Sequence, residues 1–138
     1  MRVFLALALM MMALVAPAVA QNDETPWQAT VTAQIEAFRA SDGVAALDMA
    51  GKAFKAQFED PDLFVAAIAA SGYGPIVTSR SHSFGTFERV NETRVLQVVR
   101  FVGPDQSLYE AVYELGDEPD VGWRVLGVAL RKQAGIGV

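Results

Sequence analysis

The sequence predicts an α+β fold in which N-terminal helices pack on one face of a four-stranded antiparallel sheet. Apolar residues recur at spacings of three and four between residues 25 and 72, which is the period of helices with one buried face. From Pro75 onward the apolar period changes to two, as in strands. The turns between the alternating segments are short, so we expect consecutive strands to form antiparallel hairpins.

Residues 1–20 have the three parts of a secretory signal peptide. Arg2 supplies a minimal positive region, and residues 3–15 form an apolar stretch. Ala18-Val19-Ala20 fits a cleavage site, because small residues are required there. The apolar run is shorter than the ~20 residues of a membrane-spanning helix, and Pro17 interrupts its end.

We therefore predict cleavage between Ala20 and Gln21, followed by export to the periplasm or the extracellular space. The mature chain, residues 21–138, is predicted to be a single α+β domain without stable membrane insertion. An uncleaved N-terminal anchor is the alternative, and the small residues at the cleavage site argue against it.

Composition excludes several function classes. The chain has no cysteine, so disulfides, thiolate metal ligands and a lipid-modified N-terminal cysteine are ruled out. Its formal net charge is −5, and loss of the leader removes one more positive charge. Such a protein is repelled by nucleic acid and by anionic membranes unless it carries a basic patch, and no basic run is present. We expect no nucleic-acid partner and no cofactor.

The first helix is predicted to begin at Thr25 and to end at residues 41–43. Thr25 fits the cap, Pro26 the first helical position, and Gln28 the far end of a capping box. Four apolar residues then lie on one stripe at spacings of four, four and three, and they are predicted to be core: Trp27, Val31, Ile35 and Phe38.

Two further helical segments are predicted before the sheet. Leu47, Phe54 and Phe58 continue an apolar face that Gly51 interrupts or kinks. The last helix starts at residues 60–62 with an aspartate cap and a proline, and Gly72 ends it. Its buried face is predicted to contain four residues: Leu63, Phe64, Ala67 and Ile68.

Four strands are predicted, at about residues 76–88, 94–102, 107–115 and 123–131. A turn near Pro104 places the middle strands in four facing pairs: Phe101–Tyr109, Val99–Ala111, Gln97–Tyr113 and Val95–Leu115. This face is nearly all apolar, so we expect it to meet the helices. The opposite face is predicted to be solvated because it carries Arg94, Arg100, Glu110 and Glu114. Both faces of the last strand are apolar, so its orientation stays open.

The first strand is predicted to continue the core face if Phe84 is buried. The residues of the same parity then point inward, namely Arg80, His82 and Thr86. The alternate residues point to solvent, namely Ser79, Ser81 and Ser83. A slip of one residue would exchange the two sets.

His82, in the segment SRSHSFG, is the only histidine. A histidine-based metal site needs a partner, so no metal site is predicted. Ser81 and Ser83 point away from their neighbour on one strand, and the chain has no G-x-S-x-G turn, so no catalytic triad is predicted. Two interpretations remain. His82 is a strand residue at the rim of the core, or it lines a cavity mouth with Arg80 and attracts an anionic ligand.

Gln97 opposite Tyr113 places two polar groups inside an apolar face. Buried polar groups are hydrogen-bonded, so this pair must bond each other, water or a ligand. A satisfied hydrogen bond in the core is the simpler interpretation, and ligand recognition is the alternative.

Four segments carry a family resemblance: VTAQIEAFRASD, AQFEDPDLF, SRSHSFG and GWRVLGVAL. Together they look like the landmarks of a bacterial domain-of-unknown-function family, numbered 4864, over roughly residues 27–131. That family resembles the nuclear transport factor two-like and cystatin-like architecture. The resemblance implies further helices after a long first one, a strongly curved sheet and a conical cavity between them. Its motifs are core and turn landmarks, so it implies no catalytic residues.

Two function classes follow. The favoured one is an exported, non-catalytic module that binds a small ligand or an envelope protein. The alternative is an isomerase- or cyclase-like enzyme using the same cavity, which needs an inward carboxylate base and a donor such as Tyr109 or Tyr113. Glu88 at the sheet edge is the only candidate for that carboxylate, so binding is favoured over catalysis.

The residues of shared parity give a ligand-site hypothesis. We predict one pocket, open toward the first strand, for a small, mostly apolar ligand with an acidic group. Its predicted lining is Arg80, His82, Gln97, Tyr109 and Tyr113.

Overall fold

The computed structural model describes residues 24–133. The predicted leader and its cleavage site at Ala20–Gln21 lie outside the described residues. Five helices and one π-helical turn precede the sheet: α1 (Trp27–Arg39), α2 (Gly43–Asp48), α3 (Lys52–Gln57), α4 (Pro61–Ile68), η2 (Ala69–Tyr73) and α5 (Gly74–Val77). Four strands follow: β1 (Ser81–Asn91), β2 (Arg94–Val102), β3 (Leu108–Glu118) and β4 (Gly122–Lys132).

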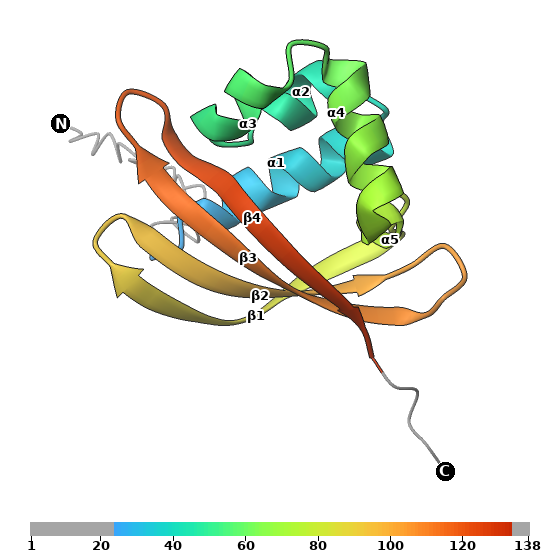
Figure 1. Ribbon diagram of the computed structural model, residues 1–138. Helices are drawn as coiled ribbons and strands as arrows, with labels where there is room; N and C mark the ends of the chain where they lie inside the picture. The colour runs from blue at the N-terminus through green and yellow to red at the C-terminus, as the bar shows by residue number, and fades with distance from the viewer. Residues whose placement is uncertain (1–23, 134–138) are drawn as a thin grey trace, which may run out of the picture.

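The α+β class predicted from the sequence is confirmed. The sheet is antiparallel in the order β1-β2-β3-β4, and the helices cover one of its faces (Figure 1). No helix within residues 24–133 is long and apolar enough to cross a membrane. The helices and the inner face of the sheet enclose one core.

Helix α1 lies along the inner face of the sheet through its predicted apolar stripe. The four stripe residues are all buried: Trp27, Val31, Ile35 and Phe38. Thr30 Oγ1 on the same helix donates to the carbonyl of Trp123 at 3.0 Å, which links α1 to β4. The Trp27 and Trp123 rings meet edge to face at 5.4 Å.

Aspartate caps begin α2 and α4, as the sequence predicts for the helix that starts near Pro61. The Asp42 carboxylate accepts from the Ala45 N–H at 3.0 Å, and Asp60 accepts from the Asp62 N–H at 2.9 Å. The kink after α4 lies at Gly72, whose φ of 97° is a left-handed conformation that glycine adopts without strain.

Two expectations for this region are wrong. Pro75 does not open a strand: it starts the short helix α5, because proline is favoured in a first helical turn, and β1 begins only at Ser81. Leu63 is 61% exposed, because α4 turns only Phe64 fully inward.

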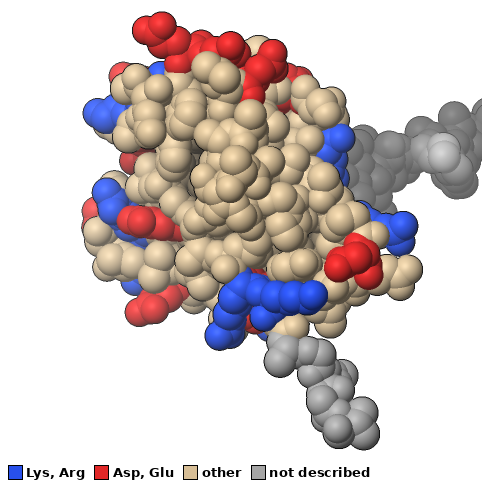
Figure 2. Space-filling view, turned by 45° about the vertical axis from the view of Figure 1, so that its right-hand side comes forward, with Lys and Arg blue, Asp and Glu red and all other residues tan. Residues whose placement is uncertain are grey.

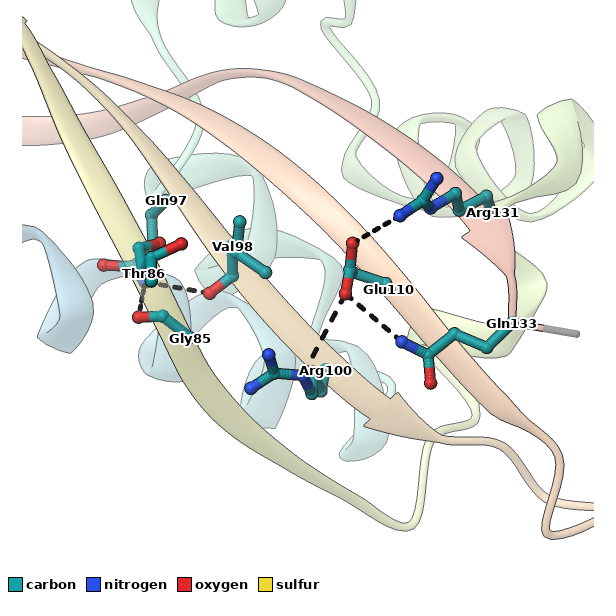
Figure 3. Close-up of polar contacts among 8 residues, drawn as sticks. All are labelled: Gly85, Thr86, Gln97, Val98, Arg100, Glu110, Arg131 and Gln133. Carbon is teal, nitrogen blue, oxygen red and sulfur yellow. Dashed lines mark hydrogen bonds and ion pairs between the residues drawn. The ribbon is translucent and has the colours of Figure 1, made fainter. Parts of the chain in front are cut away.

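The register of the middle strands is the predicted one. Strands β2 and β3 form the four expected pairs, from Phe101–Tyr109 to Val95–Leu115. The charged residues lie on the outer face, where they make ion pairs. Arg94 Nη1 lies 2.6 Å from Glu114 Oε1, and Glu110 accepts from Arg131 Nη2 at 2.9 Å (Figure 3).

Strand β1 departs from simple alternation because it contains a bulge. Phe84 pairs with Val99, and the next residue on the inner side is Phe87, which lies opposite Gln97 and is still 44% exposed. The extra residue reverses the parity, so Thr86 does not lie on the core face. The Phe87 ring then meets Trp27 edge to face at 5.0 Å.

Ser79 also differs from the prediction, because it is buried. It lies before β1 and accepts from the Arg39 guanidinium at the end of α1, with Nη2–Oγ at 3.1 Å. Ser81 and Ser83 are exposed, as predicted.

The orientation of β4, which the sequence left open, is set by a register shift in its pairing with β3 and by an isolated β-bridge. Val125 is buried, and a shift between Glu114 and Leu115 leaves Leu126 unpaired. Outside the hairpins, Ala50 bridges Val125 in parallel, so the segment between α2 and α3 protects part of this edge strand.

Candidate functional site

A cavity of about 330 Å³ lies between the helices and the inner face of the sheet. Its volume is at the lower end of the range for small-molecule sites. Four phenylalanines form its aromatic wall: Phe38 of α1, Phe54 of α3, Phe58 directly after α3, and Phe64 of α4. Phe64 is the centre of this wall, since its ring packs on the other three at 5.4 to 6.1 Å. Val125 and Val128 of β4 complete the apolar lining.

No charged side chain lines the cavity. The side of the molecule with α4 and α5, turned forward in Figure 2, is also largely free of charge, with acidic and basic groups gathered toward its margins. A carboxylate or an ammonium group inside this cavity would therefore lack an ion-pair partner.

The polar side chains of the lining belong to Gln34, Gln57, Ser71, Tyr73 and Tyr113. Gln34 Nε2 donates to the Ala46 carbonyl at 3.1 Å, and Tyr73 Oη donates to the Val128 carbonyl at 2.7 Å. Burial raises the pKa of Tyr113, while the charge of Arg39 opposes this shift. The Tyr113 phenol is thus protonated at any ordinary pH and can act as a donor.

Of the five predicted site residues, only Tyr113 lines this cavity. The other four occupy separate environments, so the structure does not bring the predicted set together in one pocket. Arg80 is exposed, and its backbone N–H donates to Val102 at 2.8 Å. The partly buried Tyr109 ring packs against Gly103, where an added Cβ would meet Tyr109 Cε2 at 2.9 Å.

Gln97 is fully buried and is satisfied by the protein itself. Its Oε1 accepts from Trp27 Nε1 at 2.8 Å and from Gln28 Nε2 at 3.1 Å. Its Nε2 donates to the carbonyls of Gly85 at 3.0 Å and Thr86 at 3.3 Å, which belong to the β1 bulge (Figure 3). Of the two interpretations, the satisfied core hydrogen bond is the one observed, with Trp27 rather than Tyr113 as the partner.

His82 bridges β1 to α1 with both ring nitrogens. Arg39 Nη2 lies 3.1 Å from Nδ1, and Thr32 Oγ1 lies 3.1 Å from Nε2. Because a guanidinium can only donate, Nδ1 must accept, and the proton is therefore on Nε2. Burial and then the Arg39 charge lower the pKa of His82, and Glu36 opposes them. The imidazole is neutral near pH 7, and its rim position matches the first interpretation.

The carboxylate that an isomerase-like reaction needs is not among the lining residues. Glu88 is exposed and pairs with Leu96, on the parity opposite to inward-facing Phe87. In residues 24–133, no group of three or more histidine, aspartate or glutamate side chains is placed to hold a metal ion.

Sequence reasoning missed Gln34 and the role of the phenylalanine wall. The signal for Gln34 was present, because it follows Val31 by three residues and therefore lies within the buried stripe of α1. A polar residue at such a position needs a partner, and only one end of this amide has one among the described residues.

Comparison with known proteins gives one match. No curated protein and no solved structure matches the chain significantly, so the resemblance to the nuclear transport factor two-like architecture stays a prediction. A family model described as a domain of unknown function (DUF4864) matches residues 20–138. The chain belongs to this family of domains of unknown function.

Proposed function

We propose that this domain is an exported, non-catalytic module that binds a small, mostly apolar ligand in the cavity between the helices and the sheet. The observation that carries the proposal is the cavity itself, about 330 Å³ of space with an aromatic wall inside a small domain. The cavity is partly open to solvent, and its size and mostly apolar lining are those of a small-molecule site. Export rests on the pattern of residues 1–20.

The ligand we propose differs in charge from the one that the sequence suggested. The sequence predicts an acidic ligand because it places Arg80 and His82 in the pocket. Neither residue is among the lining, and His82 has both nitrogens engaged. A neutral ligand is the better match to a lining without cations.

Filling the cavity tests the proposal. Ala67 on α4 lines the cavity, whereas Ala66 beside it is exposed. Propylbenzene, added to the wild-type protein, should shift the methyl NMR signals of Ile68 and Val128 in a saturable manner. Ala67→Phe should abolish these shifts, and the matched control Ala66→Phe should preserve them.

Two results would count against binding in the cavity: an absence of saturable shifts in the wild type, or equal shifts in both variants. Binding of an envelope protein through the surface, the other partner class raised by the sequence, would then take its place.

A further inference from the structure

Two polar atoms deep in the cavity have unused hydrogen-bonding capacity. Gln34 is 3% exposed and Tyr113 is 1% exposed, and both line the cavity. The Ala46 carbonyl can only accept, so it fixes the Gln34 amide with Nε2 toward Ala46 and leaves Oε1 as the remaining group. Between residues 24 and 133, no donor reaches Gln34 Oε1 and no acceptor takes the Tyr113 hydroxyl proton.

Both atoms keep access to the space of the cavity. In the described part of the chain, Arg124 Nε is the single side-chain nitrogen or oxygen that is both sealed from solvent and without a partner. Gln34 Oε1 and Tyr113 Oη also lack partners but are not sealed, and both residues line the cavity, so we infer that their residual surface faces it. A ligand can therefore reach both atoms.

The two groups are complementary in kind. The Tyr113 phenol stays protonated and is a donor, while Gln34 Oε1 is an acceptor. A ligand that satisfies both must accept one hydrogen bond and donate another. A hydroxyl or a primary amide does so, a hydrocarbon does neither, and a carboxylate only accepts.

A carboxylate is further disfavoured by its charge. The lining contains no lysine, arginine or histidine to compensate a buried anion. Arg39 influences Tyr113 from outside the lining, and its guanidinium is already engaged with Ser79 and His82.

We propose that the cavity selects neutral ligands whose head group both donates and accepts a hydrogen bond, with Tyr113 donating to it and Gln34 Oε1 accepting from it. This inference rests on the proposed function, since it names the ligand class of the same cavity. The apolar body of the ligand lies against the phenylalanine wall, and the head group lies between α1 and β3.

Four probes with one phenylpropyl body test the selection: 3-phenylpropanol, 3-phenylpropanamide, 3-phenylpropanoate and propylbenzene. Dissociation constants are measured by NMR titration at pH 7.5 with the wild-type protein and with Tyr113→Phe. Tyr109→Phe is the matched control, because Tyr109 lies on the same face of β3 as Tyr113, four residues before it, but does not line the cavity.

We expect the alcohol or the amide to bind about tenfold more tightly than propylbenzene, and the carboxylate to bind most weakly. Tyr113→Phe should reduce the preference for the polar probe severalfold, and Tyr109→Phe should leave it unchanged. The readout is the ratio of affinities within each folded variant, so a change in overall stability does not affect it.

The outcomes separate the two proposals. If propylbenzene binds as tightly as the alcohol and the amide, or if the carboxylate binds best, the selection is overturned while binding in the cavity stands. If the preference survives in Tyr113→Phe, the assigned donor is wrong and the inference falls. If none of the four probes binds, both proposals fail.

Discussion

Replacing Gln97 by leucine should destabilise the domain, because this residue is fully buried and its amide is hydrogen-bonded at both ends. The side chain is fully buried and has four sets of hydrogen-bond partners. These are the Trp27 indole, the Gln28 amide, the carbonyls of the β1 bulge and the Val98 carbonyl at 2.8 Å. Leucine has a similar volume, so the change removes hydrogen bonds without leaving a large cavity.

The expected cost follows from the partners that are left behind. Trp27 Nε1 is buried and loses its acceptor at 2.8 Å, which costs about 1–3 kcal/mol for an unsatisfied donor. The carbonyls of Gly85 and Thr86 are only partly buried, and losing their donor adds about 0.5–1.5 kcal/mol. Burial of the leucine side chain offsets part of this loss. We expect a net decrease of about 1–3 kcal/mol in the free energy of unfolding.

Urea unfolding followed by far-UV circular dichroism measures this decrease. Gln28→Leu is the control, because it removes one partly buried hydrogen bond to the same Oε1 and should cost at most about 1 kcal/mol. In Trp27→Phe the orphaned donor is gone, so adding Gln97→Leu should cost at least about 1 kcal/mol less than it does alone. Equal effects of Gln97→Leu and Gln28→Leu would refute the reasoning.

Three further outcomes are expected. Phe101→Ala and Leu115→Ala should each lower the free energy of unfolding by about 2–5 kcal/mol, because both are buried on the inner face; near-neutral urea midpoints would contradict the assignment of that face. His82 has a lowered pKa in the folded state, so the unfolded chain binds its proton first. Stability should therefore fall as the pH drops below about 6.5, and His82→Gln should flatten this part of the stability–pH curve; an unchanged slope would count against it. Mass spectrometry of the exported protein should show cleavage after Ala20, and a retained Met1 would disprove that prediction.

Local chemistry explains why the middle of the sheet could be predicted. Gly103 and Pro104 mark a tight turn, which is closed by the Gly103 N–H donating to the Ser107 carbonyl at 2.8 Å. Once the turn is placed, the register follows, and alternation then assigns every inward residue of β2 and β3.

The predictions for β1 and for Pro75 were wrong because another local sequence preference determined the structure there. Gly85 within an alternating segment is a sign of a bulge, and the bulge moved Phe87 into the place expected for Thr86. Proline can start a helix as well as precede a strand, and at Pro75 it starts one.

A cavity between helices and sheet is predicted from the family resemblance, but most of the residues that line it could not be predicted. Phe54 and Phe58 were identified as apolar, but the space they border depends on how far α3 and α4 stand from β4. That distance is set by contacts between segments far apart in the chain. Alternation along paired strands is enough to place Tyr113 on the inner face of the sheet. It gives no information on which helix residues lie next to Tyr113.

The linear strand order has a consequence for how the domain assembles. Each strand pairs with its neighbour in the chain, so the sheet can grow hairpin by hairpin with little loss of loop entropy. The hydrogen bond between Trp27 and Gln97 instead spans 70 residues. We expect the four-stranded meander to form early and α1 to dock late. Until α1 docks, the Gln97 amide is hydrogen-bonded to water. Docking of α1 then supplies the Trp27 indole and completes the native state.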